Sequence, residues 1–176
     1  MAVRRALASI ALAMAGMGAA HAETVDVSAS GFLVTIRKEV KATPQQVFDA
    51  FGQVDKWWNG EHTYSGNAAH LSIGMSAGDC FCERWNGGSV LHARVIYVRQ
   101  GSTLRMQGSL GPLQDLAVNG VLTWATGTAD GKTVIKFLYR VGGSPGAALD
   151  KLAPSVDAVL DEQATRLVNL LETGKP

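Results

Sequence analysis

The sequence predicts one α+β domain in which a curved antiparallel sheet of about six or seven strands wraps around a long C-terminal helix. Three observations lead to this prediction. Residues 31–40 alternate apolar and polar side chains, as a half-buried strand does. Residues 70–141 consist of short alternating runs separated by Gly, Asn, Asp and Ser, which is typical of an antiparallel meander. Residues 154–173 repeat apolar side chains at spacings of three and four, as an amphipathic helix does.

A leader is expected before this domain, over residues 1–22. Arg4 and Arg5 precede the apolar run Ala6–Ala20, and Ala20-His21-Ala22 matches the small-x-small pattern that signal peptidases cut. The run is short and rich in Ala and Gly, so a cleaved signal peptide is favoured over an uncleaved membrane anchor. We therefore expect a periplasmic or secreted protein with no stable membrane anchor after cleavage.

Length and composition bound the remaining chain. About 154 residues follow the leader, enough for one domain and too few for two. We expect a polar extension over residues 23–30 and the folded domain over residues 31–176. The 16 Lys and Arg residues are balanced by 15 Asp and Glu residues, so the basic surface of a nucleic-acid-binding protein is absent. With 47% hydrophobic residues and no second run long enough to span a bilayer, the chain is expected to be globular.

The strand at residues 31–40 leads directly into a short helix. Thr43 can cap this helix, Pro44 fits its first position, and Gln46 stands where a capping box requires Glu or Gln. The helix should end near Phe51. A second helical turn is expected soon afterwards, before Asn59-Gly60 stops it.

The meander begins with a hairpin. Residues 79–85 and 90–98 flank Asn86-Gly87-Gly88-Ser89, a strong turn sequence. Later strands are expected at 103–109, 116–126 and 132–141, with Asp130-Gly131 between the last two. In the final strand, one face collects Ile135, Phe137, Tyr139 and Val141. One face of the sheet should therefore be dry and the other wet.

The C-terminal helix should begin near Pro154, after the Gly-rich break at residues 142–146. Its apolar stripe consists of Val156, Val159, Leu160, Gln163, Leu167, Leu170 and Leu171. Gly174 is expected to be its C-cap. A helix of this length extends roughly 28 Å, which is enough to lie across the sheet.

This order of elements is that of a helix-grip fold, and the chain resembles the START-like or SRPBCC superfamily. The resemblance is to the branch related to activators of a heat-shock chaperone ATPase and to polyketide cyclase-like proteins. It rests on Thr43-Pro44-Gln45-Gln46-Val47-Phe48, Trp57-Trp58, Gly78-Asp79-Cys80-Phe81-Cys82-Glu83, Asn119-Gly120-Val121-Leu122-Thr123-Trp124 and the C-terminal helix. The resemblance implies a deep apolar cavity between sheet and helix that binds a hydrophobic small molecule. It does not imply one reaction, because members include carriers, cyclases, dehydratases and chaperone cofactors. The expected leader argues against stimulation of a cytosolic chaperone.

The Cys80-x-Cys82 pair is the sharpest local signal. In a regular strand both sulfurs share the more apolar face of the hairpin with Arg84. Buried thiols, a disulfide and a soft-metal site are the three interpretations, of which buried thiols are favoured. Alternate Cα atoms of a strand lie about 6.6 Å apart, so a disulfide would require a bulge. No metal or other cofactor is expected, because Glu83 and His92 should lie on the opposite side of the hairpin.

Few residues are candidates for catalysis. Glu83 should face His92 across the hairpin as a charge pair on the wet face, and these two residues with Tyr139 are weak acid/base candidates. Isolated histidines at 62 and 70 are expected to be solvated loop residues. A serine hydrolase is excluded although Ser144 lies in a Gly-x-Ser-x-Gly pattern, because Pro145 has no N–H to lend to an oxyanion.

The expected function is that of an exported carrier that holds a lipid or polyketide-like compound without catalysing a reaction. Side chains expected to line its pocket are Trp58, Cys80, Cys82, Arg84, Tyr97, Met106, Trp124, Phe137 and Tyr139. A packed core of the same residues, without a ligand, is the alternative. Two other functions stay open: a cyclase or hydro-lyase that uses Glu83 and His92 or Tyr139, and an adaptor that presents the sheet's outer face to a partner protein. Oligomeric state stays open.

Overall fold

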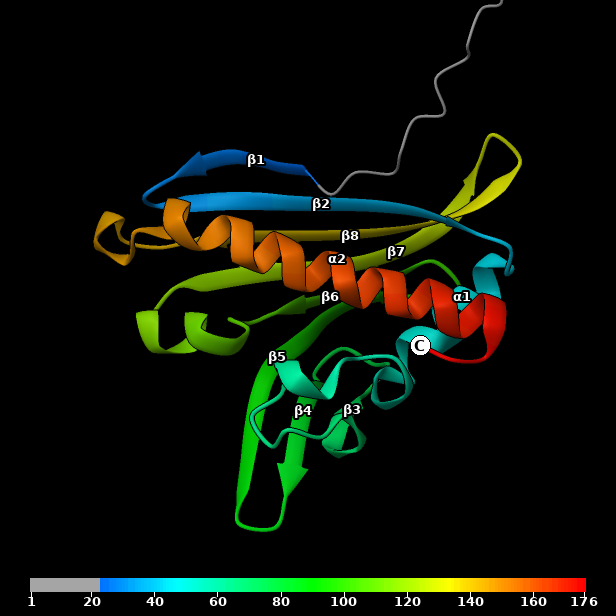
Figure 1. Ribbon diagram of the computed structural model, residues 1–176, viewed down its shortest axis with the longest axis horizontal. Helices are drawn as coiled ribbons and strands as arrows, with labels where there is room; N and C mark the ends of the chain where they lie inside the picture. The colour runs from blue at the N-terminus through cyan, green and yellow to red at the C-terminus, as the bar shows by residue number, and fades with distance from the viewer. Residues whose placement is uncertain (1–22) are drawn as a thin grey trace, which may run out of the picture.

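The computed structural model describes residues 23–176, and the expected leader lies outside these residues. Eight antiparallel strands form one curved sheet in the order β1-β2-β8-β7-β6-β5-β4-β3. The strands are β1 Glu23–Ser28, β2 Gly31–Val40, β3 Leu71–Ile73, β4 Cys80–Trp85, β5 Gly88–Arg99, β6 Thr103–Gln107, β7 Asn119–Ala129 and β8 Lys132–Gly142. Two α-helices, α1 Pro44–Phe51 and α2 Leu149–Thr173, complete the α+β fold class predicted from the sequence (Figure 1).

Five short 3₁₀ helices lie in the connections. They are η1 Val54–Lys56, η2 Gly60–His62, η3 Ala68–His70, η4 Gly111–Leu116 and η5 Pro145–Ala147. The first three belong to the long connection between α1 and β3, and η4 connects β6 to β7. Within residues 23–176, no helix combines the length and the apolar character needed to cross a membrane.

The α1 helix is confirmed together with its capping box. The Thr43 hydroxyl accepts a hydrogen bond from the backbone N–H of Gln46 at 3.2 Å, and the Gln46 side chain accepts one from the backbone N–H of Thr43 at 2.8 Å. Val47, Phe48 and Phe51 are buried on the side of the helix that faces the sheet. Local sequence therefore sets both the start of this helix and its buried face.

Residues expected to form a polar extension instead form β1. This strand pairs with β2, with Thr24 opposite Val34 and Val25 opposite Leu33. The ladder is irregular between Val25 and Ser28, where Asp26 takes a left-handed backbone conformation with φ at 54°. Strand formation here depends on pairing with β2 and packing against α2, which no local pattern indicates.

The α2 helix starts at Leu149, five residues before the predicted start. The N–H of Leu149 donates to the carbonyl of Ala29 in the β1–β2 turn at 3.0 Å, so a long-range contact fixes this end. Pro154 consequently lies inside the helix, where its ring faces solvent. Gly174 ends the helix as predicted: its φ is 78° and its N–H donates to the carbonyl of Leu170 at 2.9 Å.

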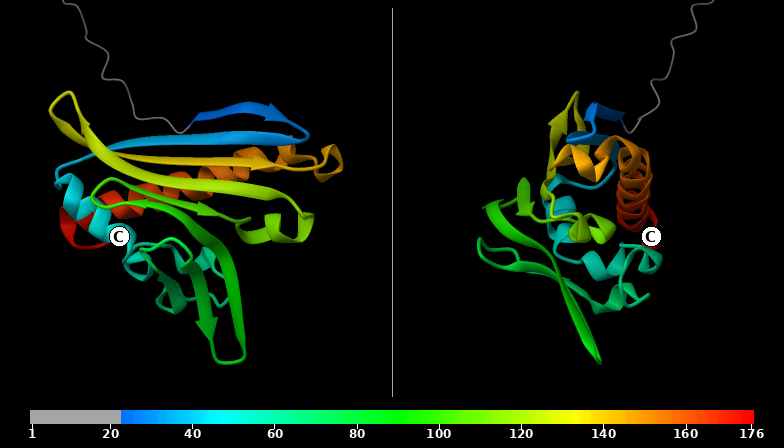
Figure 2. Two further views of the ribbon diagram at one scale, coloured as in Figure 1. Left: turned by 180° about the vertical axis from the view of Figure 1, so that it is seen from behind. Right: turned by 90° about the vertical axis from the view of Figure 1, so that its left-hand side faces the viewer.

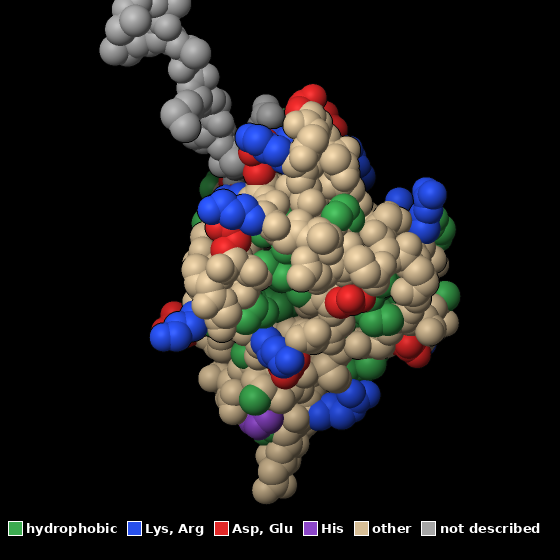
Figure 3. Space-filling view, turned by 90° about the vertical axis from the view of Figure 1, so that its right-hand side faces the viewer, with side chains coloured by type: hydrophobic (Ala, Val, Ile, Leu, Met, Phe, Trp, Pro, Cys, Tyr) green, Lys and Arg blue, Asp and Glu red, His purple; other side chains and the backbone are tan. Residues whose placement is uncertain are grey.

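The α2 helix packs along β1, β2 and β8, on the inner side of the curved sheet (Figures 1 and 2). We call residues 57–70 the cap segment, because they lie on the same side and cover β4 where α2 does not reach (Figure 2). The α2 helix and the cap segment together therefore cover the inner face of the sheet. At the end of the molecule that carries α1 and the last turns of α2, acidic and basic side chains are intermixed (Figure 3).

Candidate functional site

A one-residue bulge in β5 decides which side chains of the β4–β5 hairpin face the interior. Phe81 pairs with Ala93 but Cys82 pairs with Leu91, so His92 is the extra residue. The bulge turns both His92 and Ala93 inward, and Phe81 points inward opposite them. The expectation of a regular hairpin, with the cysteine face inside, is therefore wrong.

Glu83 and His92 are buried, not on the wet face that the alternation predicted. Their exposed fractions are 0% and 6%, and His92 Nε2 lies 3.1 Å from Glu83 Oε2. The same carboxylate accepts hydrogen bonds from the backbone N–H groups of Tyr64, at 3.0 Å, and Ser65. Strand β4 and the cap segment thus meet at one buried carboxylate.

The protonation states of the pair follow from this geometry. Burial raises the pKa of Glu83, but hydrogen bonds from Ser65, Tyr64 and His92 outweigh it and lower that pKa below its ordinary value. Burial lowers the pKa of His92, and Glu83 opposes this shift only in part. At neutral pH the pair is a carboxylate and a neutral imidazole, with Nε2–H donating to Glu83. The other ring nitrogen, Nδ1, is then a base without a hydrogen bond to any described residue.

A surface hollow of about 410 Å³ opens beside His92, where β5 and β6 separate. It is lined by Leu91, His92, Ala93, Arg94, Gln107, Gly108, Ser109 and Gln114. Gly108 makes this geometry possible, because a Cβ there would overlap the carbonyl oxygen of His92. The hollow gives the solvent a route towards the buried pair.

Tyr64 joins the cap segment to η4 next to this hollow. Its hydroxyl donates to the carbonyl of Gly111 at 3.0 Å, and its ring lies 5.9 Å from the His92 ring. The Gln114 side chain donates to the carbonyl of Leu91 at 3.0 Å, which fixes η4 against β5. The cap segment and η4, which are distant in sequence, therefore lie against each other next to His92.

Behind His92 lies a cluster of aromatic rings, which we call the aromatic core. Its members are Phe51, Trp57, Trp58, Phe81, Trp124 and Phe137, and all are buried. The Phe81 ring lies 4.9 Å from His92 and 5.4 Å from Trp58, so it connects the polar pair to the core. Trp124 lies 5.1 Å from Trp57 and 5.3 Å from Phe137. The buried acid/base pair and the aromatic core form one continuous site.

The aromatic core contains one unpaired polar group. The indole N–H of Trp124 is buried and has no hydrogen-bond partner. By contrast, the Trp57 N–H donates to the carbonyl of Ala50 at 2.8 Å and the Trp58 N–H donates to the carbonyl of His62 at 3.2 Å. Buried donors are nearly always satisfied in proteins, so this N–H marks a place where an acceptor atom would be stabilised.

Five of the expected pocket residues point into the interior. These are Trp58, Met106, Trp124, Phe137 and Tyr139, all of them buried. They contact one another and the rest of the core, so the space between sheet and α2 is packed rather than hollow. The Tyr139 hydroxyl donates to Gly108 O at 3.1 Å and accepts from Leu110 N–H at 3.0 Å, and burial raises its pKa to about 12. Tyr139 therefore holds the β6–η4 connection in place as a neutral phenol.

The other four expected pocket residues do not face the interior. Tyr97 is 44% exposed, because a second bulge pairs Val95 with Met106 but Tyr97 with Arg105. Its ring lies on the outer side, 5.5 Å from the Arg105 guanidinium. Cys80, Cys82 and Arg84 lie on the face of β4 opposite to Phe81, and Arg84 is exposed. The period-2 pattern assigned all four to the wrong face because it did not include the bulges.

Cys80 and Cys82 form a disulfide rather than the favoured pair of buried thiols. Their Cα atoms are 5.4 Å apart, shorter than the spacing of about 6.6 Å in a regular strand. The ladder irregularity between Phe81 and Cys82 is the β5 bulge at His92, so it lies on the strand opposite the bridge. The Nη2 atom of Arg84 lies 3.7 Å from Cys80 Sγ on the same face.

The cap segment is fastened to α2 by polar contacts. The backbone N–H of Asn59 donates to the Gln163 side chain at 2.7 Å, and its side chain donates to Glu162 at 2.6 Å. His62 Nε2 lies 2.9 Å from another oxygen of Glu162. His70 Nδ1 lies 2.9 Å from the Ser65 hydroxyl. Both loop histidines therefore have partners. The partner of His62 could not be found by sequence inspection because Glu162 is 100 residues away.

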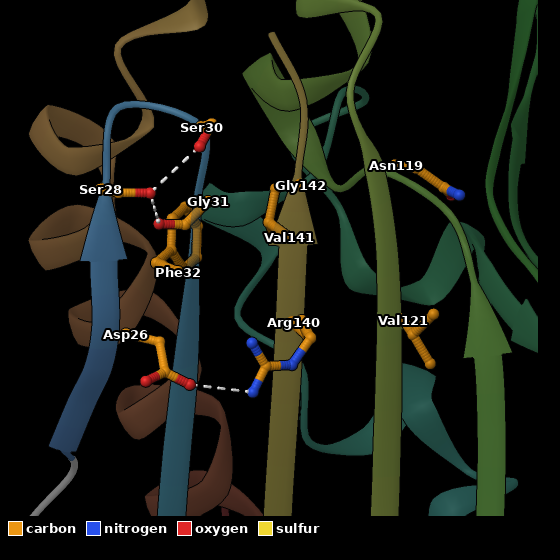
Figure 4. A pocket seen from close by; sticks show the side chains of 10 residues that line it. All are labelled: Asp26, Ser28, Ser30, Gly31, Phe32, Asn119, Val121, Arg140, Val141 and Gly142. Carbon is orange, nitrogen blue, oxygen red and sulfur yellow. Dashed lines mark hydrogen bonds and ion pairs between the residues drawn. The ribbon is translucent and has the colours of Figure 1, made fainter. Parts of the chain in front are cut away.

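A second hollow lies on the neighbouring strands β1, β2, β8 and β7, on the face away from α2 (Figure 4). Its lining residues are Asp26, Ser28, Ser30, Gly31, Phe32, Asn119, Val121, Arg140, Val141 and Gly142. Asp26 and Arg140 form an ion pair at 3.1 Å, and Ser28 and Ser30 share a hydrogen bond at 3.2 Å. Because these exposed groups satisfy one another, we assign the candidate site to the His92 side.

No protein-family model and no curated protein matches the sequence. Solved structures with the same fold include DynU16 from the dynemicin biosynthetic locus, with a TM-score of 0.60 and 22% identity over 82% of this chain and 48% of that one. The Aha1 dimer from Colwellia psychrerythraea has a TM-score of 0.56 and 20% identity over 82% of this chain and 98% of that one.

The di-domain ARO/CYC protein StfQ from the steffimycin biosynthetic pathway has a TM-score of 0.55 and 13% identity over 81% of this chain and 51% of that one. The chain spans about half the length of DynU16 and of StfQ. Identities this low establish the fold alone. The resemblance inferred from the sequence is confirmed at that level: the chain has the START-like helix-grip fold that it shares with Aha1 and with polyketide cyclase-like proteins.

Proposed function

We propose that this protein binds a hydrophobic small molecule of polyketide-like or lipid chemistry against the aromatic core. The observation that carries the proposal is the buried, unpaired N–H of Trp124 among apolar rings. A ligand with a carbonyl or ether oxygen would supply the missing acceptor, and its apolar part would contribute roughly 25 cal/mol per Å² buried. DynU16, from the dynemicin biosynthetic locus, and the ARO/CYC protein StfQ, from the steffimycin biosynthetic pathway, support a polyketide-like ligand.

The polar end of the ligand would lie towards Glu83 and His92. These residues are the charged and ionisable groups in contact with the aromatic core through Phe81. A neutral His92 offers Nδ1 as an acceptor for a ligand hydroxyl. A phenol or an enol therefore fits this end better than a carboxylate, which Glu83 would repel.

Binding requires the cap segment to move, because the aromatic rings are in contact. Trp57 and Trp58 are packed in the aromatic core, but the rest of the cap segment is held by hydrogen bonds to Glu162, Gln163 and Glu83. Polar contacts of this kind break and reform more readily than a packed apolar interface, so residues 59–70 are the part that would move. The closed arrangement is one state of an equilibrium that a ligand would shift by binding only the open state.

The binding test follows tryptophan fluorescence during titration with three probes: a hydroxyanthraquinone, anthracene and palmitate. Trp124→Phe removes the N–H and retains the ring, so it should weaken hydroxyanthraquinone binding by about tenfold and leave anthracene binding unchanged. Trp85→Phe, at the tip of the β4–β5 hairpin, is the matched control. Failure of all three probes to bind the wild-type protein would refute the proposal.

A second candidate function is a cavity enzyme of the cyclase or hydro-lyase type, which the buried Glu83–His92 pair favours. Glu83 would hold the imidazole by Nε2–H while Nδ1 removes a proton next to a ligand carbonyl. The pair has the base-plus-orienting-group arrangement common to general-base sites. Tyr139 is not part of this step, because its hydroxyl is already bonded to backbone on both sides.

The enzyme candidate is tested with α-tetralone in D₂O, by following deuterium uptake next to the carbonyl by NMR. Wild-type protein should accelerate the exchange, and His92→Gln should abolish the acceleration. Glu83→Gln should reduce it, because the imidazole loses its orienting partner. An exchange rate equal to that of free imidazole at the same concentration would contradict the enzyme candidate and leave ligand binding as the proposed function.

We also propose that the protein is exported to the periplasm or secreted. The small-x-small site before residue 23 and the Cys80–Cys82 disulfide support this, since disulfides persist mainly in oxidising compartments. The test is fractionation of the native host followed by N-terminal sequencing. An intact Met1 in the cytosolic fraction would contradict the proposal.

A further inference from the structure

We propose that the Cys80–Cys82 disulfide is a thiol–disulfide exchange site whose substrate is a small or flexible dithiol of negative charge. The site is distinct from the ligand site described above. Phe81 points into the aromatic core, whereas the two flanking sulfurs lie on the opposite face of β4.

The two sulfurs are not equally accessible. Cys80 is partly exposed at the start of β4, whereas Cys82 is 5% exposed. An incoming thiolate must approach one sulfur in line with the bond to the other, so the exposed sulfur is the one it reaches. Attack is therefore directed to Cys80, and Cys82 is the first leaving group.

The bridge does little for the stability of the fold. It closes a loop around a single residue, and the entropy that a cross-link removes from the unfolded chain is smallest for the shortest loops. Strand β4 is already paired with β3 on one side and β5 on the other, so its course does not depend on the bridge. A structural role explains the presence of this disulfide poorly.

Two arginines lie near Cys80. The Arg84 guanidinium lies 3.7 Å from Cys80 Sγ and is also near the Ser72 hydroxyl, at 3.4 Å. Arg94 is the cross-strand partner of Cys80 and is exposed, with one nitrogen donating to Gly78 O at 3.0 Å. These charges stabilise a thiolate on Cys80 and attract an anionic substrate to it.

The exchange has two balanced steps. A substrate thiolate attacks Cys80 Sγ, the bond to Cys82 breaks, and Cys82 leaves with the electron pair and takes up a proton. The second substrate thiolate then attacks the substrate sulfur of the mixed disulfide and expels Cys80 as a thiolate beside Arg84. The substrate loses two electrons and becomes a disulfide, and the protein disulfide becomes a dithiol. Oxidised glutathione restores the protein by the reverse exchange.

The first experiment treats the folded, oxidised protein with reduced dithiothreitol and counts the thiols released, while circular dichroism follows the fold. Two thiols should appear with no loss of native signal. Arg84→Gln should slow the release about threefold or more, and Arg99→Gln, an exposed arginine at the end of β5, should not change it. A disulfide that resists dithiothreitol until urea unfolds the chain would overturn the proposal.

The second experiment assigns the reacting sulfur. The Cys82→Ser and Cys80→Ser variants each keep one thiol. Both are incubated with oxidised glutathione, and mass spectrometry follows the formation of the glutathione adduct. Glutathione should join Cys80 at least about tenfold faster than Cys82. Equal rates would contradict the assignment, and if either variant fails to fold, the comparison of Arg84→Gln with Arg99→Gln in the otherwise unchanged protein decides the question.

The third experiment tests the charge of the substrate. Two flexible dithiol peptides of equal length, one flanked by Asp and the other by Lys, are oxidised by the protein under identical conditions. The acidic peptide should react faster, and the difference should shrink at high salt because screening weakens the attraction to Arg84 and Arg94. Equal rates for the two peptides would contradict the preference for a negatively charged substrate, and a faster reaction of the basic peptide would overturn the proposal.

Discussion

The imidazole of His92 donates a hydrogen bond to the carboxylate of Glu83 at 3.1 Å inside a sheet whose residue pattern places both on the outside. The β5 bulge turns His92 inward, and the cap segment supplies two backbone donors to the same carboxylate. One buried pair therefore connects the sheet, the cap segment and the aromatic core. Its protonation state should control how firmly the cap is held.

Acid should destabilise the protein in two stages. The pKa of His92 is lower in the folded state than its ordinary 6.5. The contribution of neutral His92 to the free energy of unfolding is therefore fully present above pH 6.5 and is lost as the pH falls towards the folded-state pKa. The pKa of Glu83 is lower than its ordinary 4.5, so its contribution is present above 4.5 and is lost as the pH falls through the folded value. Urea unfolding at several pH values between 7 and 3 measures both stages, and Glu83→Gln should reduce the lower stage. A free energy of unfolding that is constant across this range would contradict the assignment.

Glu83→Gln should also release the cap segment locally. The amide cannot accept two backbone N–H groups and the imidazole as strongly as the carboxylate does, so the amides of Tyr64 and Ser65 should exchange with D₂O about tenfold faster or more. Hydrogen-exchange mass spectrometry of the peptide that covers residues 60–70 measures this. Glu39→Gln, which alters an exposed carboxylate paired with Lys132, should leave that peptide unchanged.

Gly108→Ala should be strongly destabilising. A methyl group at this position would overlap the carbonyl oxygen of His92 and the Cα of Ala93, and backbone cannot yield as a flexible side chain can. We expect a loss of about 2 kcal/mol or more in the free energy of unfolding, measured by urea titration. Gly127→Ala in β7 is the control: no heavy atom lies within 4 Å of its added Cβ, so its effect should stay within about 1 kcal/mol. Equal effects of the two substitutions would show that the close approach at Gly108 has no energetic weight.

The fold could be predicted where local patterns decide the structure. The α1 capping box and the Asp130-Gly131 turn, both of whose residues have positive φ, are read directly from short stretches of sequence. The weak strand β1 and the start of α2 could not be predicted, because pairing with β2 and the bond from Leu149 to Ala29 determine them. These are contacts between residues distant in sequence.

The candidate site was predicted only in part, for a related reason. Trp124 and Phe137 lie on regular strands, where alternation assigns the face correctly. Glu83, His92 and Tyr97 lie next to bulges, where one inserted residue reverses the assignment. The Cys80-x-Cys82 spacing was no signal for the first bulge, because the disulfide shortens β4 whereas the inserted residue lies in β5.

Tyr139→Phe should destabilise the protein without changing its chemistry. The substitution leaves the carbonyl of Gly108 and the N–H of Leu110 without their hydrogen-bond partner in a part-buried setting, so a loss of about 2 kcal/mol is expected in urea unfolding. Alkaline titration of tyrosinate absorbance should lose the component near pH 12 in this variant, because burial raises the pKa of Tyr139 to about 12. The α-tetralone exchange described above should be unaffected at a temperature where the variant is folded. If the exchange rate of folded Tyr139→Phe were lower than that of the wild type, the hydroxyl would instead contact the ligand and not only the backbone groups of Gly108 and Leu110.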